Sequence, residues 1–379
     1  MQYRKFGNTG VNISTLGFGC MRFPEYEKDG KWYIDDDKVF PMLKKAYELG
    51  VNYFDTGYVY CHTNSEVSLG KGVKDFRDKV YISNKIPGWD SRVKKYGDYR
   101  RFLEMQLKNM DLEYLDFYHF WSLDQGSFEG HILKNDFIKE AVKAKEEGLI
   151  KHISFSYHGN PDYIPTLLEK AEVMETMLVQ YNLLDRAYEK AIAHAKSKGL
   201  GVLAMGPVAG GRLAAPTDLL KKVTGKDSTA TYELALKFVL SNQNIDCALS
   251  GMTKLEEVVN NAAIMSDENK FTAEDHAKIL EAMDSMKNFS DLPCTGCKYC
   301  MPCTVEIDIP RLFEIYNMHN VYGLTNVAKG MYNDYKKNHP NSMPSACAEC
   351  GKCEEICPQS IEIISKLRLV EKTMETLVK

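Results

Sequence analysis

The sequence predicts an α/β protein made of a (β/α)8 TIM barrel and a small, mainly helical C-terminal domain. The first observation is an alternation: between residues 13 and 252, short runs of β-branched, aromatic and small residues are followed by longer segments of helical period. This occurs eight times, and eight strand–helix units of this size match a TIM barrel. The second observation is that eight of the 11 cysteines lie between Cys294 and Cys357.

Each of the eight expected barrel strands is short and apolar. They lie at residues 14–21, 51–56, 79–85, 115–121, 151–157, 177–181, 200–205 and 246–250. Amphipathic segments between them, such as residues 39–50, 136–148 and 185–199, end on glycine, which is typical of a helix C-terminus. A doubly wound open sheet is the alternative, but no GxGxxG motif follows the first strand. The barrel is therefore preferred.

The pattern changes near residue 288. A last barrel helix is expected at residues 272–286, and the segment NFSDLP at residues 288–293 then breaks the alternation. We therefore expect the barrel at residues 1–288 and the cysteine-rich domain at residues 289–379. In that second domain residues 310–317 and 361–378 have helical period. An apolar stripe in the latter consists of Leu367, Val370, Met374 and Leu377.

The composition is that of an ordinary globular protein, with 44% hydrophobic and 26% charged residues. Forty-eight basic and 52 acidic residues give a net charge of -4, which offers no electrostatic basis for binding nucleic acid or a membrane surface. No stretch approaches the ~18 apolar residues that a spanning helix needs. The N-terminal MQYRKFGNTG lacks the apolar core of a secretory signal, so a cytoplasmic location is expected.

The clustered cysteines form two runs. The second run, which ends in proline, fits the C-x2-C-x2-C-x3-C-P pattern of bacterial ferredoxins, in which the fourth cysteine ligates the other cluster. The first run departs from this pattern, because two residues instead of three separate its third cysteine from its fourth. By this logic one [4Fe–4S] cluster is held by Cys294, Cys297, Cys300 and Cys357. The other is held by Cys347, Cys350, Cys353 and Cys303.

A pair of structural zinc sites is the alternative for these cysteines, because Cys₄ zinc sites also use C-x2-C pairs. Zinc sites usually present two separated pairs, whereas each run here holds four cysteines in succession. Clusters are therefore favoured. The 43 residues between Cys303 and Cys347 are long for a compact two-cluster ferredoxin and favour a helical variant of a ferredoxin-like domain.

Three polar residues are expected together at the C-terminal mouth of the barrel, where TIM-barrel active sites lie. Asp55 ends the second strand, Tyr60 follows five residues later, and Lys85 ends the third strand. The Lys85 ammonium would lower the pKa of the Tyr60 phenol, and Asp55 would hold the lysine. Tyr60 could then protonate an alkoxide as hydride arrives at carbon. The alternative is a buried Asp55–Lys85 ion pair beside a surface tyrosine.

Several motifs in combination resemble those of aldo-keto reductases over about residues 1–288. They include YRKFGNTGVNISTLGFGCMRFP, GVNYFDTGYVY, VYISNKI, LVQYNLL, GPVAGGRL and SGMTKLEEVVNNA. The cysteine-rich tail resembles the one carried by a bacterial and archaeal branch of that family. The resemblance implies a TIM-barrel oxidoreductase and adds weight to a catalytic role for Asp55, Tyr60 and Lys85.

The chain departs from the family at a fourth position. Members usually have a histidine near the end of the fourth strand, in a Y-x-D-x-Y-x-x-H pattern, where this sequence has Trp121. His119 lies two residues earlier, so its side chain shares a face of the strand with Trp121. His119 either reaches the site from one layer deeper or is a core histidine, while Trp121 reshapes the substrate pocket.

The resemblance also implies a site for NADP(H). Ser156 and Gln180 match positions that hold the nicotinamide amide, Tyr181 is a candidate stacking residue, and Asn261 matches an adenine contact. The phosphate-binding region matches two loops, with Gly206, Pro207, Gly210 and Gly211 in the first and Ser250, Gly251, Met252, Thr253 and Lys254 in the second. The alternative is that these glycines only make tight turns between strands and helices.

Three functions are weighed. The first is an oxidoreductase that reduces a small carbonyl-type substrate with NADP(H), with two [4Fe–4S] clusters for electron transfer. The second does not use nicotinamide: a ferredoxin-type partner drives reduction of a non-carbonyl substrate, with a flavin as a further candidate cofactor. The third is an electron-transfer subunit whose barrel is a docking module. The presence of Asp55, Tyr60 and Lys85 together argues against the third.

Overall fold

The computed structural model describes residues 1–87, 92–183, 185–209, 213, 231–267, 274, 276–277, 279–281, 292, 294, 300–357 and 360–379. The chain divides into two compact units. The first comprises Met1–Gly210 with Glu233–Ala273, and the second Gly211–Tyr232 with Glu274–Lys379. The boundary expected between residues 288 and 289 and most of the helix expected at residues 272–286 lie outside the described residues.

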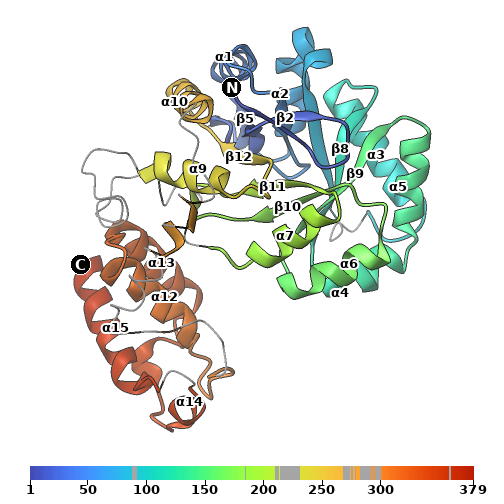
Figure 1. Cartoon of the computed structure of the whole chain (residues 1–379). Coiled ribbons are helices and arrows are strands. Elements are labelled where there is room, and N and C mark those ends of the chain that lie inside the picture. The colour runs from blue at the N-terminus through green and yellow to red at the C-terminus, as the bar shows by residue number, and fades with distance from the viewer. Residues whose placement is uncertain are drawn as a thin grey trace. The chain divides into compact units, whose positions relative to one another are not determined.

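The first unit contains a closed barrel of eight parallel strands (Figure 1). The strands are β3 (Leu16–Gly19), β6 (Tyr53–Asp55), β7 (Tyr81–Pro87), β8 (Leu115–Leu123), β9 (Ile150–Tyr157), β10 (Thr176–Gln180), β11 (Gly201–Met205) and β12 (Cys247–Gly251). Strand β12 pairs with β3 and closes the ring. Each strand coincides with one of the eight expected segments. The predicted TIM barrel is therefore confirmed, and the open-sheet alternative is excluded.

Helices cover the outside of the strand ring (Figure 1). They are α1 (Asp36–Glu48), α2 (Ser65–Gly72), α3 (Asp98–Met110), α5 (Phe137–Glu146), α6 (Ile164–Lys170), α7 (Glu189–Ser197), α9 (Thr231–Ser241) and α10 (Leu255–Ser266), with the one-turn α4 (Gln125–Ser127). Helix α1 buries Val39, Met42, Leu43 and Ala46, whose spacing places them on one face. Two aspartates in its first turn complement the helix dipole.

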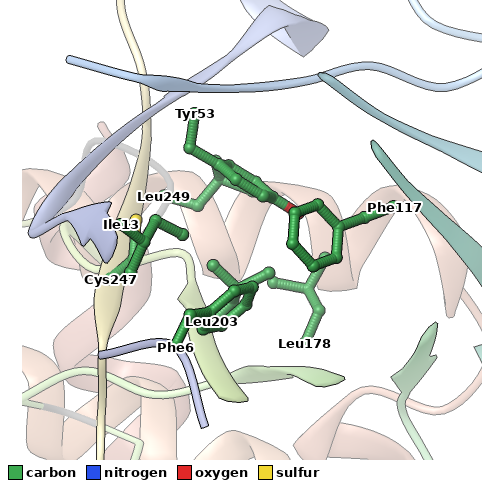
Figure 2. Packing of buried hydrophobic residues seen from close by; sticks show 8 residues of the cluster. All are labelled: Phe6, Ile13, Tyr53, Phe117, Leu178, Leu203, Cys247 and Leu249. Carbon is green, nitrogen blue, oxygen red and sulfur yellow. The ribbon is translucent and has the colours of Figure 1, made fainter. Parts of the chain in front are cut away.

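A short hairpin at the N-terminus packs against the apolar interior of the barrel. It consists of β1 (Tyr3–Lys5) and β2 (Asn12–Ser14), which pair antiparallel. Figure 2 shows Phe6 and Ile13 from this hairpin region against side chains of five barrel strands. The cluster consists of Phe6, Ile13, Tyr53, Phe117, Leu178, Leu203, Cys247 and Leu249. Cys247 is thus a core residue, as its apolar surroundings in the sequence suggest.

A second hairpin follows the first barrel strand, after the single turn η1 (Cys20–Arg22). It consists of β4 (Glu25–Lys28) and β5 (Lys31–Ile34). His62, in the loop after β6, stacks on Trp32 with ring centroids 4.8 Å apart, and its Nδ1 lies 2.8 Å from Glu25 Oε1. The hairpin therefore contacts the loop that carries Tyr60. The alternation of strands and helices in the sequence did not predict the β4–β5 hairpin.

The described part of the second unit is helical. It contains α12 (Ile309–Asn320), α13 (Thr325–Asn338), the one-turn α14 (Lys352–Glu355) and α15 (Ile363–Val378). Helices α12, α13 and α15 contact one another. Their buried residues include Phe313, Tyr332, Leu367, Val370 and Met374, so the apolar stripe expected on the last helix lies largely in this core. Helices α12 and α13 together occupy most of the long segment between the cysteine runs.

Neither the barrel unit nor the cysteine-rich unit holds, within the described residues, a helix long and apolar enough to cross a membrane.

Candidate active site and cluster-binding cysteines

An ion pair between Asp55 and Lys85 lies at the C-terminal end of the barrel strands. The Lys85 Nζ is 2.5 Å from Asp55 Oδ2 and also donates to the Thr56 carbonyl at 2.5 Å. Ser83 donates its hydroxyl to the second carboxylate oxygen at 2.6 Å. Lys85 is 1% and Asp55 2% exposed. The two residues that the sequence placed at this mouth are therefore paired, with their remaining polar atoms satisfied.

Two aromatic rings surround the Lys85 ammonium. The Nζ atom is 4.7 Å from the ring centre of Tyr60 and 5.8 Å from that of Trp121. The two rings meet edge to face, with centroids 5.4 Å apart and an interplanar angle of 89°. A Cβ atom at Gly57 would lie 3.1 Å from both rings, so the glycine permits this close approach. Tyr60 is thus not an isolated surface residue.

The pKa values define the charge state of this group. Burial raises the pKa of the Tyr60 phenol, Lys85 lowers it and Asp55 raises it, with a net increase. Lys85 thus lowers the pKa of Tyr60 as expected, but burial outweighs the ammonium, so the pKa lies above its ordinary value rather than below it. Burial also works against the charged form of Lys85, but Asp55 and Tyr60 outweigh it and raise the pKa of the lysine. Lys85 remains an ammonium, and Tyr60 a neutral donor.

His119 lies inside the barrel rather than at its mouth. It is the register partner of Lys85 across β7 and β8, is fully buried, and its Nε2 lies 3.3 Å from the Tyr53 hydroxyl. Burial is the main reason that its pKa falls to about 4, with Asp55 opposing and Lys85 adding to the decrease. A neutral imidazole therefore lies buried in the barrel interior, where both of the expected placements put it.

Most residues expected to hold the nicotinamide lie at neighbouring strand ends. Ser156 is the last but one residue of β9 and accepts a hydrogen bond from the Ser122 backbone N–H at 2.7 Å. Gln180 ends β10, is exposed, and donates to Asp185 at 3.1 Å. Tyr181 departs from the expected stacking role, because its ring is fully buried and stacks on Phe238 at 5.5 Å. The tyrosine belongs to the barrel's packing.

The two candidate phosphate loops follow β11 and β12. Gly206 has φ +64°, and its carbonyl accepts from the Asn182 amide at 3.0 Å. Pro207 is buried, whereas Gly210 and Gly211 lie outside the described residues. After β12, Ser250 accepts from Asn261 at 3.3 Å, and Met252 is buried while Gly251, Thr253 and Lys254 are exposed.

Sequence reasoning missed Arg22 at this mouth. Its side chain crosses Gly251, where an added Cβ would come within 3.2 Å of the arginine Cδ. The arginine is exposed and lies beside the backbone of the second phosphate loop. A flexible cation beside a glycine backbone suits an anionic group. The arginine comes from the turn after the first strand, which the sequence motifs did not connect to the loop after the eighth.

All four cysteines of one expected cluster site, Cys303, Cys347, Cys350 and Cys353, lie among the described residues. Burial raises the pKa of Cys353, and Glu354, Cys347 and Cys303 add to the increase. Thr304, next to Cys303, has its hydroxyl 3.7 Å from Cys350 Sγ. The end of the first run therefore lies beside the second run, and the ligand set Cys303, Cys347, Cys350 and Cys353 stays a prediction. Thiolates are the ligands that [4Fe–4S] clusters require.

The other expected site is described only in part. Cys294, Cys300 and Cys357 are partly buried, and Cys297 lies outside the described residues. Among the residues that the structure describes, no three His, Cys, Asp or Glu side chains converge as ligands of a single metal ion.

The fold and this site define an oxidoreductase built on a TIM barrel, and sequence comparison identifies its family. Residues 15–284 match the aldo/keto reductase family, and residues 293–362 match a 4Fe-4S dicluster domain. The chain therefore belongs to the aldo/keto reductase family and carries an iron–sulfur domain. The resemblance stated from the motifs is confirmed, and the dicluster match favours clusters over zinc.

Curated relatives share the barrel at modest identity. L-galactose dehydrogenase of Arabidopsis thaliana is 27% identical over 294 residues, which cover 70% of this chain and 89% of the relative. The uncharacterized oxidoreductase YqkF of Bacillus subtilis is 24% identical over 291 residues, which cover 69% and 90%.

Solved structures show the same barrel fold. The holo form of aldo-keto reductase AKR11C1 from Bacillus halodurans superposes with a TM-score of 0.64 at 23% identity, covering 74% of this chain and 96% of the other. An aldo/keto reductase from Klebsiella pneumoniae, solved in complex with NADP and acetate, gives 0.59 at 22% identity, with 73% and 93% covered.

Proposed function

We propose that the chain reduces a small carbonyl-type substrate with NADP(H) at the C-terminal mouth of its barrel. We further propose that two [4Fe–4S] clusters in the second unit transfer electrons. The observation that supports the first statement best is the Asp55–Lys85–Tyr60 group, in which a buried ammonium lies against a phenol ring. The family match supports a reductase but leaves the substrate open.

Each residue of this group has a distinct role. Tyr60 donates its phenolic proton to the carbonyl oxygen as negative charge develops there. Lys85 stabilises the phenolate that this transfer leaves, because its raised pKa keeps it charged. Asp55, fixed by Ser83, holds the ammonium against the ring. Trp121 packs edge to face on Tyr60 and limits the shape of the substrate that can approach it.

NADPH, when bound, supplies the hydride. We assign its amide end to Ser156 and Gln180 and its phosphates to the loops at residues 206–211 and 250–254, with Asn261 behind the second loop. Arg22 joins this set because its side chain lies across Gly251. The solved relative that contains NADP supports this cofactor class by analogy of fold.

The clusters raise a question of electron count. Nicotinamide delivers two electrons as hydride, whereas a [4Fe–4S] cluster usually passes one, and a flavin commonly links the two kinds of carrier. The sequence has no recognisable flavin motif, so we propose a ferredoxin-type protein as the partner that exchanges electrons with the clusters. The expected ligand sets are Cys294, Cys297, Cys300 and Cys357 for one cluster and Cys303, Cys347, Cys350 and Cys353 for the other.

One observation favours a second candidate function. The mouth has Trp121 where relatives of the family place a histidine, and His119 is fully buried with a pKa of about 4. A site without a substrate-facing imidazole suits a reductase of a non-carbonyl substrate that takes its electrons from a ferredoxin, with or without a flavin. This candidate does not need nicotinamide.

Anaerobic purification followed by an NADPH titration tests both candidates. Two clusters predict about eight irons and eight sulfides per chain. Saturable NADPH binding supports the first candidate, and bleaching of the visible cluster absorbance by NADPH would show that nicotinamide and clusters exchange electrons. If NADPH does not bind and reduced ferredoxin bleaches the clusters, the second candidate replaces the first. Zinc without sulfide would contradict both.

A further inference from the structure

A buried carboxylate lies directly behind the strand that carries Lys85. Glu66 is in the first turn of α2, the helix that follows the Tyr60 loop, and it is fully buried. Its Oε1 accepts from Asn84 Nδ2 at 2.9 Å and from Gln106 Nε2 at 2.7 Å. Its Oε2 accepts from Asn109 Nδ2 at 2.9 Å. Three amide groups from β7 and α3 therefore converge on one side chain.

No lysine or arginine of the described residues forms an ion pair with Glu66. Burial raises the pKa of its carboxyl, and the hydrogen bonds from Asn109, Asn84 and Gln106 oppose that increase. The first turn of a helix adds a modest stabilisation for a negative charge. A buried acidic group without a cation is costly compared with an apolar side chain of similar size. The buried Glu66 carboxylate is explained if the side-chain amides that it orients also hold another residue in place.

The same amides hold both backbone polar groups of Lys85. The Lys85 N–H donates to Asn84 Oδ1 at 2.8 Å, and Gln106 Nε2 donates to the Lys85 carbonyl at 3.0 Å. Gln106 Oε1 accepts from the buried Tyr118 hydroxyl at 2.5 Å. Each hydrogen of the Gln106 amide thus has an acceptor, and its oxygen has a donor.

The acceptor character of Glu66 fixes the direction of these amides. An ionised carboxylate only accepts, so Asn84 and Gln106 must turn their NH₂ groups toward it. With its NH₂ group so placed, Asn84 presents its oxygen to the Lys85 N–H. An apolar side chain at position 66 would remove this constraint and leave buried N–H groups without an acceptor.

We propose that Glu66 is a positioning residue for Lys85. By orienting Asn84 and Gln106 it clamps the Lys85 backbone from both sides, and this clamp holds the ammonium against Asp55 and Tyr60. Glu66 also ties the helix that follows the Tyr60 loop to the strand of Lys85. The functional meaning of this clamp rests on the proposed reductase chemistry, in which Lys85 acts on Tyr60, but the clamp itself can be measured without turnover.

Site-resolved labelling of Lys85 provides the test. The cluster-loaded full chain is treated with formaldehyde and cyanoborohydride, and methylation of each lysine is followed by peptide mass spectrometry, with exposed Lys38 as the internal reference. Lys85 is 1% exposed and should label slowly in the natural protein. We expect Glu66→Leu to raise its relative labelling rate about tenfold, because a weakened clamp shifts local opening. Glu66→Gln keeps one acceptor oxygen and should restore most of the protection.

Glu140→Leu is the matched control. Glu140 is another almost fully buried glutamate, 5% exposed on α5, and it accepts from the backbone of Gly97 and Arg100 instead. The proposal expects Glu140→Leu to leave Lys85 labelling unchanged. It is overturned if Glu66→Leu leaves Lys85 as protected as in the natural chain, or if Glu140→Leu exposes it equally.

If Glu66→Leu is not recovered folded, Gln106→Met tests the same clamp from the α3 side. It should raise Lys85 labelling, and unchanged labelling would again overturn the proposal. Absence of carbonyl reduction in the natural chain would count against the proposed function alone, since the labelling needs no substrate and no nicotinamide.

Discussion

The Nζ atom of Lys85 lies 2.5 Å from Oδ2 of Asp55, and neither residue is more than 2% exposed. Lys85→Met would leave the carboxylate buried without a cation, so we expect a loss of about 3–5 kcal/mol in the free energy of unfolding. The double variant that combines Lys85→Met with Asp55→Leu should recover most of that loss. Urea unfolding followed by circular dichroism measures the free energy of unfolding of both variants.

An exposed ion pair provides the control for this prediction. Lys139 lies 2.7 Å from Asp136 with 73% of its side chain exposed, so Lys139→Met should change stability by less than about 0.5 kcal/mol. Equal effects of Lys85→Met and Lys139→Met would show that the buried pair does not matter for stability.

Removal of the Tyr60 hydroxyl tests the proposed proton donor. Tyr60→Phe keeps the ring that packs on Trp121, so the fold and NADPH binding should persist. We expect carbonyl reduction to fall by a factor of about 10² or more, because general acid catalysis is lost. Steady-state rates on a panel of aldehydes and ketones check this. Tyr58→Phe, in the same loop, should keep its activity, and an active Tyr60→Phe variant would remove Tyr60 from the mechanism.

The burial of His119 should make the stability of the protein depend on pH. Its pKa is about 4 in the folded protein against an ordinary value of 6.5, so the unfolded chain binds the proton more readily. Stability is therefore unaffected by this group above pH ~6.5 and falls as the pH decreases toward ~4, by about 3 kcal/mol in total. The difference between the natural chain and His119→Gln in urea unfolding isolates this contribution. Parallel pH profiles of the two proteins would contradict the burial of a neutral imidazole.

The sequence was a good guide to the barrel and a poorer guide to what surrounds it. The eight strands were predictable because buried parallel strands are short apolar runs with helices between them. The β4–β5 hairpin was not, because its exposed residues give no apolar run. Tyr181 was misjudged since its position after a strand does not reveal whether its ring faces the mouth or Phe238. Glu66 was missed because its importance depends on amides distant in sequence.

Arg22 is expected to contribute to cofactor affinity. Its side chain lies across Gly251, beside the loop assigned to the phosphates. Arg22→Ala should weaken NADPH binding about tenfold, the loss of roughly one charge-assisted hydrogen bond. Fluorescence titration at two salt concentrations measures the affinity for NADPH. The difference in affinity between Arg22→Ala and the natural chain should be smaller at high salt, because salt screens the charge of the arginine. Lys28→Ala, on the exposed hairpin, serves as the control. Identical affinities for Arg22→Ala and the natural chain would exclude the assignment.

The crossing of ligands between the two cysteine runs can be tested by counting iron. The hydroxyl of Thr304, next to Cys303, lies 3.7 Å from Cys350 Sγ, so the end of the first run lies beside the second run. If the fourth ligand of each cluster comes from the other run, as proposed, Cys303→Ser should damage the cluster whose other ligands are Cys347, Cys350 and Cys353. We expect both Cys303→Ser and Cys353→Ser to lose about half of the roughly eight irons.

Cys61→Ser is the control for this measurement, because Cys61 is buried in the barrel unit and bonds to the backbone of Cys20. Its iron content should equal that of the natural chain. If Cys303→Ser instead removes the cluster of Cys294, Cys297 and Cys300 and leaves that of Cys353 intact, each run holds its own cluster. Electron paramagnetic resonance of the reduced variants distinguishes the two cases, because the signal that remains identifies the surviving cluster.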